Sequence, residues 1–168
     1  VENPEFEKRR DEIESLLASL NKVGVTVYIA EDYNFPRTHR GSYYTDTNSF
    51  FLNMGYVYDT ATFMKVFRHE GWHAAQDCMA GTIDNSMIAV IYDDHQVPPQ
   101  WILSAKSRYR GDFARAVPWE QEAIWAGNTP GMTERALAAC ADDTPMWHIY
   151  SPTPKTAEWL EENGYEVL

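Results

Sequence analysis

The chain has few cysteines, few basic residues and no long apolar segment. Only two of its 168 residues are cysteine, Cys78 and Cys140, and neither lies in a CxxC pair, so a zinc knuckle built from thiolates is not expected. Lys and Arg number 14 against 25 Asp and Glu, and the formal net charge of -11 repels nucleic acid and anionic membrane surfaces at long range. No apolar run approaches the roughly 20 residues that a membrane helix needs. We therefore expect neither nucleic acid nor a membrane as a partner.

The two cysteines leave two alternatives, one disulfide or two buried thiols. Each cysteine ends an expected helix, which favours the disulfide, and a disulfide would fit an exported protein. The segment VENPEFEKRRDE at the start of the chain is too polar for a signal peptide. The first residue is Val rather than Met, which fits either removal of a signal peptide or a shortened chain. These features favour export without deciding the compartment.

Length and composition predict one domain over residues 1–168, since 44% of the residues are hydrophobic and 14% are aromatic. Helical spacing of apolar residues is expected to turn Phe6, Ile13, Leu16, Leu17 and Leu20 inward from a helix over residues 4–20. A β-branched strand is expected at 25–30, a hairpin at 41–53, and a helix from Thr60 to Cys78 capped by Asp59 or Thr60. Further helices are expected at 85–94, 99–109, 118–127, 130–141 and 154–164. The order of a helix, a small antiparallel sheet and then helices predicts an α+β fold.

The segment FRHEGWHAAQDC, residues 67–78, sets His69 and His73 four residues apart around Glu70. On a helix the two imidazoles project in the same direction from successive turns, so two ring nitrogens can converge on one metal ion. Glu70 falls between the histidines and the apolar stripe of the helix, where it can take a proton from water on the metal without being a ligand. Gly71 is unfavourable inside a helix, which indicates close approach of another element. The alternative is that these polar side chains are merely solvated, or satisfied, at the rim of a core helix.

The complete HExxH pattern on a helix, HEGWH at residues 69–73, resembles the active-site helix of the zincin metallopeptidases. The resemblance extends over residues 40–127, because the hairpin at 41–53 is similar to the zincin edge strand that flanks the cleft and pairs with extended peptide substrate. It implies one catalytic Zn2+, a water polarised by it, and hydrolysis of a peptide bond with Glu70 as the base. The segment AAQDCMAG after His73 lacks the Gly and His of the longer motif HExxHxxGxxH. The chain is therefore more similar to the gluzincins, in which a glutamate from a later helix completes the site.

The third zinc ligand that this resemblance implies is Glu120, in EQEA at residues 120–123, which matches the ExxA pattern of gluzincin-like families. Ile124 stands where those families often carry Asp or Asn, so the usual partner of the ligands is missing. On a helix that starts near Pro118, Glu120 points into an apolar arc and Glu122 points outside it, which favours Glu120 over Glu122. The alternative is that the glutamates are only the acidic first turn of a helix, favourable beside the positive end of its dipole.

Four other residues are candidates for a part in the site. Tyr109, flanked by two arginines, or His148 could stabilise the oxyanion of a tetrahedral intermediate, and the sequence does not choose between them. Asp77 could hold the second ring nitrogen of His73, although a solvated helix end is the expected interpretation. His95, beside two aspartates, could bind a second metal, although an ordinary loop histidine is expected there.

Together these features predict a small zinc-dependent endopeptidase of zincin type, with one Zn2+ held by His69, His73 and Glu120 and with a peptide or protein substrate. The alternative is a non-catalytic or regulatory protein of zincin-like fold that binds, or acts on, a single protein partner. No pattern in the sequence specifies the cleavage site or the oligomeric state.

Overall fold

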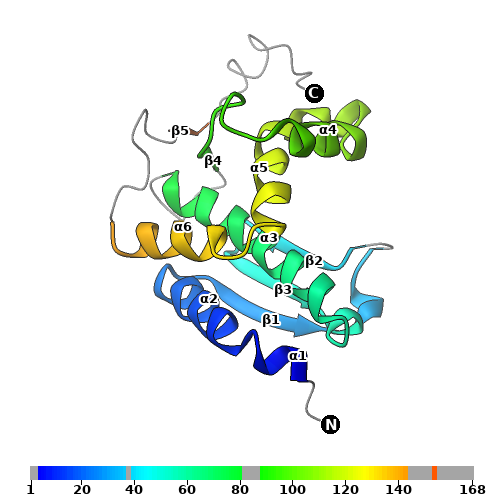
Figure 1. Ribbon diagram of the computed structural model, residues 1–168, viewed down its shortest axis with the longest axis vertical. Coiled ribbons are helices and arrows are strands. Elements are labelled where there is room, and N and C mark those ends of the chain that lie inside the picture. Colours follow the sequence, from blue (N-terminus) through cyan, green and yellow to red (C-terminus); the bar gives the residue numbers. More distant parts are fainter. Residues whose placement is uncertain (1–3, 37–38, 81–87, 144–152, 155–168) are drawn as a thin grey trace.

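The computed structural model has the expected α+β composition, with a three-stranded sheet between α2 and α3 and further helices beyond α3 (Figure 1). The structure describes residues 4–36, 39–80, 88–143 and 153–154. The α-helices are α1 (Pro4–Glu7), α2 (Arg10–Lys22), α3 (Thr60–Met79), α4 (Pro99–Arg108), α5 (Val117–Gly127) and α6 (Met132–Ala141), and short 3-10 helices span Asp32–Asn34, Met54–Tyr56 and Gly111–Ala116. The strands are β1 (Thr26–Ala30), β2 (Gly41–Tyr44), β3 (Ser49–Asn53), β4 (Ala89–Val90) and β5 (Thr153–Pro154).

The three-stranded sheet has the order β1-β3-β2 and is mixed, so the expectation of an antiparallel sheet is wrong. β2 and β3 pair antiparallel, with Tyr43 opposite Phe50, which confirms the predicted hairpin. β1 instead pairs in parallel with β3, with Val27 opposite Phe50. The difference arises because the chain passes from β1 to the far edge of the sheet before it returns as β3 in the middle. The pattern of apolar residues specifies a strand but does not specify its neighbour.

The helix α3 crosses the middle of the molecule and supplies a large part of its core (Figure 1). Its Phe67 ring lies edge-on to Phe50 of β3, with ring centroids 5.5 Å apart, and both side chains are buried. Leu16 and Leu20 of α2 are buried in the same cluster, as predicted, whereas Leu17 is 40% exposed. The single helix expected over residues 4–20 is divided into α1 and α2, and the apolar face of α2 is narrower than expected.

α3 begins and packs as its sequence predicts. The Asp59 carboxylate accepts a hydrogen bond from the backbone N–H of Thr62 at 3.1 Å, which makes Asp59 the N-cap. A Cβ atom at position 71 would lie 3.0 Å from Cγ2 of Thr133 on α6. The close approach expected at Gly71 is therefore confirmed, and it allows α6 to lie directly against α3.

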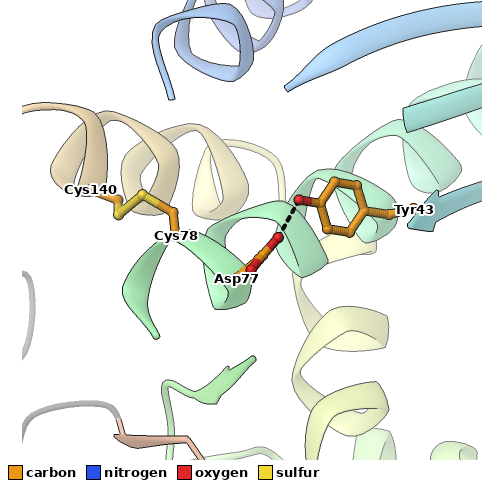
Figure 2. Close-up of a disulfide and its surroundings, with 4 residues drawn as sticks. All are labelled: Tyr43, Asp77, Cys78 and Cys140. Atoms are coloured by element: carbon orange, nitrogen blue, oxygen red, sulfur yellow. Dashed lines mark hydrogen bonds between the residues drawn. A yellow bond between two sulfur atoms is a disulfide. The ribbon is translucent and has the colours of Figure 1, made fainter. Parts of the chain in front are cut away.

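A disulfide joins Cys78, near the end of α3, to Cys140, near the end of α6 (Figure 2). This confirms the favoured alternative for the two cysteines. The bond links positions 62 residues apart in the sequence. It holds the last turn of the helix with the HExxH motif against α6.

The prediction of a helix at residues 85–94 is wrong for residues 88–94, the part of this segment that the structure describes. This part contains β4, which pairs antiparallel with β5. The backbone N–H groups of Ile91 and Tyr92 donate to the buried carboxylate of Glu122 at 3.0 and 2.8 Å. These backbone N–H groups are hydrogen-bonded to a distant side chain, so burial leaves them paired without a helix.

The other expected helices in the second half of the chain are confirmed where they are described. α4, α5 and α6 coincide closely with the segments expected at 99–109, 118–127 and 130–141. The helix expected at 154–164 lies outside the described residues, apart from Pro154 in β5. Among the described helices, none combines the length and the apolar character needed to cross a membrane.

Candidate metal centre

Two helices bring three side chains with ligand atoms together. His69 and His73 project from successive turns of α3, and their ring centroids are 5.0 Å apart. Glu120 in the first turn of α5 faces both rings, with Oε2 at 3.0 Å from His69 Nε2 and Oε1 at 3.2 Å from His73 Nε2. One ligand atom from each residue lies within 4.8 Å of the other two. The packing of α5 on α3 thus places the predicted ligands side by side.

The cluster fits a metal ion better than it fits a closed network of hydrogen bonds. The side chains are only 20% exposed at His69, 12% at His73 and 16% at Glu120. Glu120 Oε2 is buried, and none of the described residues gives it a hydrogen bond of good geometry, although His69 Nε2 lies 3.0 Å away. A buried carboxylate oxygen without a donor is unfavourable unless a cation binds it. Two imidazole nitrogens and a carboxylate oxygen are a donor set that catalytic zinc sites use, with a fourth position open.

The charges of the cluster depend strongly on one another. Burial alone lowers the pKa of His73, but the Glu120 carboxylate, assisted by Glu70 and Gln76, outweighs burial and raises this pKa to about 10. Burial alone raises the pKa of Glu120, but His73 and the nearby His69 hold it well below its usual value. In the metal-free protein the cluster is therefore a protonated imidazole beside a carboxylate. Metal binding has to displace the proton of His73.

The edge strand β2 passes beside Glu70 of the HExxH motif. A Cβ atom at Gly41, the first residue of β2, would lie 2.6 Å from Val66 Cγ1 and 3.2 Å from Glu70 Cγ on α3. A larger residue would push the strand away from the helix, so glycine is required for this approach. β2 and Glu70 are therefore adjacent in the structure.

Tyr109 is the one of the two oxyanion candidates that the structure describes. It follows α4 and packs against the small core cluster between α4 and α5. Burial raises the pKa of its phenol, and the negative charges of Glu120 and Glu70 raise it further, so the hydroxyl remains protonated. A neutral phenol in this place can donate a hydrogen bond into the site. His148 lies outside the described residues.

Glu122 is not part of the cluster of His69, His73 and Glu120, but the expectation that its side chain points out of the apolar arc of α5 is wrong. Its carboxylate is fully buried and accepts hydrogen bonds from Trp72 Nε1, Gln76 Nε2 and the backbone N–H groups of Ile91 and Tyr92, at 2.6 to 3.1 Å. Burial raises its pKa to about 7 against the opposing effect of these donors. A helix with one solvent-facing side would leave Glu122 outside, whereas α5 packs against α3, α4 and β4 and has no such side at this position.

Gln76, which its sequence context did not mark as a candidate, contacts the proposed ligand His73. Its Oε1 lies 2.7 Å from Nδ1 of His73. The signal was present, because a residue three positions after His73 lies on the same helical face. Asp77, the residue considered for this role, is buried rather than solvated and accepts a hydrogen bond from Tyr43 of β2 (Figure 2). His95 is a loop histidine with a 67% exposed side chain, as expected.

No protein family, curated protein or solved structure matches this chain. The chemistry of the three-residue cluster and of its neighbours is therefore what supports a function. The cluster could hold one metal ion, and a carboxylate on the same helix, a neutral phenol and an edge strand lie around it.

Proposed function

We propose that the protein is a zinc-dependent hydrolase of peptide bonds. The observation that carries this proposal is the convergence of His69, His73 and Glu120 beside Glu70, a carboxylate of the same helix that is outside the ligand set. Structural zinc sites are closed by four protein ligands, whereas this cluster has three among the described residues. Three ligands with an adjacent carboxylate are typical of hydrolytic zinc sites.

The residues of the site have separate roles in this reaction. His69, His73 and Glu120 would hold the ion, and zinc, when bound, supplies a Lewis acid that acidifies water and polarises a carbonyl group. Glu70 takes a proton from the attacking water and passes it to the leaving amine nitrogen. Tyr109 donates a hydrogen bond from its neutral phenol to the carbonyl oxygen as negative charge develops there.

The surroundings of the cluster favour an extended peptide as the substrate. β2 pairs with β3 on one side, and no strand among the described residues pairs with its other side. The contact of Gly41 with α3 brings this open edge beside Glu70. An open edge binds an extended peptide through backbone hydrogen bonds, whatever the peptide's side chains. It can therefore align a scissile bond with the site.

Metal content and hydrolysis, measured on the same preparations, test the proposal. The purified protein should contain one zinc ion per chain and digest casein, with activity lost to a chelator and restored by added zinc. His73→Ala should lose metal and activity together, because two remaining ligands hold zinc poorly. His95→Ala removes an exposed histidine and is the matched control, which should retain both.

Two results would count against the proposal in different ways. Absence of zinc binding by the wild-type protein would remove the metal site itself. Zinc held by the cluster without hydrolysis of any peptide would leave the site but support the alternative, a binding or regulatory protein with a single protein partner.

A further inference from the structure

We infer that Gln76 is a positioning residue that fixes the ring orientation and the tautomer of His73, so that its Nε2 atom faces the metal position. The inference rests on the proposed zinc site and goes beyond it, because Gln76 does not belong to the ligand set. Three contacts of one buried amide group carry it.

The first contact joins the amide to the histidine. Gln76 Oε1 lies 2.7 Å from His73 Nδ1, while the other ring nitrogen of His73, Nε2, lies 3.2 Å from Oε1 of Glu120. An amide oxygen only accepts hydrogen bonds, so His73 Nδ1 must carry the proton. In a neutral imidazole this leaves the lone pair on Nε2, the nitrogen that faces Glu120.

The other two contacts prevent the amide from turning over. Gln76 Nε2 donates to Glu122 Oε1 at 2.6 Å and to the backbone carbonyl of Trp119 at 3.1 Å. Rotation of the amide by half a turn would set its oxygen against two acceptors and its NH2 group against the Nδ1–H of His73. The side chain of Gln76 is fully buried, so water cannot compensate for that mismatch. Only one orientation of the amide is satisfied.

Glu122 makes this orientation rigid. Its carboxylate also accepts hydrogen bonds from Trp72 on α3 and from the backbone of Ile91 and Tyr92 beyond β4. Every one of these partners is a donor, so the carboxylate presents an acceptor to Gln76 and keeps the amide oxygen turned toward His73. Ile124, four positions after Glu120, has an apolar side chain and cannot accept a hydrogen bond from His73, whereas Gln76 on α3 can.

The nitrogen atoms of His73 can be tested directly in the zinc-loaded wild-type protein. Long-range proton–nitrogen spectra of 15N-labelled protein should show a proton on Nδ1 and zinc on Nε2. The Nδ1 proton should exchange slowly with solvent and resonate far downfield, because it is buried and hydrogen-bonded. Zinc on Nδ1, or a rapidly exchanging Nδ1 proton, would overturn the inference without removing the zinc site.

Variants of Gln76 distinguish an effect on the orientation of His73 from an effect on the stability of the fold. Gln76→Leu should weaken zinc binding about 10- to 100-fold, measured by competition with a chromophoric chelator, and should lose the protected Nδ1 proton signal. Gln76→Glu keeps an acceptor for Nδ1–H and should retain that signal, even though it sets a second carboxylate against Glu122. Gln121→Leu is the matched control, since Gln121 is equally buried but donates to Asp94 instead of contacting a histidine, and it should keep the wild-type zinc affinity.

The outcomes distinguish this inference from the proposed function. Wild-type zinc binding with an unchanged affinity in Gln76→Leu would overturn the role of Gln76 and leave the metal centre intact. An equal loss of affinity in Gln76→Leu and Gln121→Leu would show only a structural effect and would also overturn it. If Gln76→Leu does not fold, the signals of the wild-type protein and of Gln76→Glu still decide the question.

Discussion

The hydroxyl group of Tyr43 on β2 donates a hydrogen bond to Oδ2 of Asp77 on α3, one turn beyond His73 (Figure 2). This contact ties the edge strand to the helix that carries two of the proposed metal ligands. The second oxygen of Asp77, Oδ1, is buried without a hydrogen-bond partner among the described residues. Burial raises the pKa of Asp77 to about 6, although the hydrogen bond from Tyr43 opposes the increase.

Asp77 should therefore make the stability of the metal-free protein decrease between about pH 4 and pH 6. In this range the folded state retains a proton on Asp77 that the unfolded chain has released, so rising pH favours unfolding. Asp77→Asn removes this contribution, and its melting temperature relative to wild type should be higher at pH 7.5 than at pH 4.5. Thermal unfolding followed by circular dichroism in the presence of a chelator measures the difference. Asp46→Asn, at an exposed position in the hairpin, is the control and should show no such trend.

Reduction of the bond between Cys78 and Cys140 should lower the melting temperature. The bond closes a loop across 62 positions, and the loss of chain entropy in the unfolded state is worth about 4 kcal/mol for a loop of this size. Intact mass should be smaller than that of the reduced chain by two hydrogen atoms, and replacement of both cysteines by serine should destabilise the protein similarly. Free alkylation of both thiols in the native, unreduced protein would contradict the bond.

Glu70→Gln should separate metal binding from turnover. The amide cannot accept the proton of the attacking water, so peptide hydrolysis should fall by at least about 10²-fold. Zinc content should stay at the wild-type level because Glu70 is not in the ligand set. Metal analysis and initial rates on the same preparation check both statements. A variant that hydrolyses peptides at the wild-type rate would exclude Glu70 as the base.

Glu120 and Glu122 should respond differently to substitution. Glu120→Gln should lose zinc affinity with the fold intact, because it alters a ligand at the partly open cluster. Glu122→Ala should mainly lower the free energy of unfolding, by about 3 kcal/mol or more, because it leaves several buried donors without an acceptor. Denaturant unfolding in a chelator and zinc competition measure the two effects. Loss of zinc in a fully stable Glu122→Ala protein would reverse the assignment.

A buried ion pair anchors α2 to α3 and gives a further prediction. Arg68 donates two hydrogen bonds to the Glu12 carboxylate, at 2.6 and 3.1 Å, and the side chains are only 7% and 13% exposed. Glu12→Ala leaves the guanidinium buried and unpaired, so it should destabilise the fold by about 3–5 kcal/mol. Glu7 pairs with Arg10 on the surface, and Glu7→Ala should have no measurable effect on denaturant unfolding. Equal effects of the two substitutions would contradict the importance of the buried pair.

The features that the sequence predicted correctly depend on spacing within one segment. The i, i+4 spacing of His69 and His73 puts both rings on one face of a helix, whatever that helix packs against. The cap at Asp59 and the hairpin of β2 and β3 are likewise set by residues within a few positions of each other. Glu120 was likewise selected by its place in a short motif, while its approach to His69 and His73 required the packing of α5 on α3.

Only the tertiary structure determined which residues from distant segments of the chain contact one another. The parallel pairing of β1 with β3, the burial of Glu122 among donors from α3 and the segment after β4, and the Tyr43–Asp77 hydrogen bond each join residues more than twenty positions apart. Gln76 depends on both local spacing and tertiary packing. Its position three residues after His73 places it on the same face of α3 as that histidine, but the orientation of its amide is set by Trp119 and Glu122 of α5. Spacing along a chain determines which side chains share a face, and packing determines which donors and acceptors meet there.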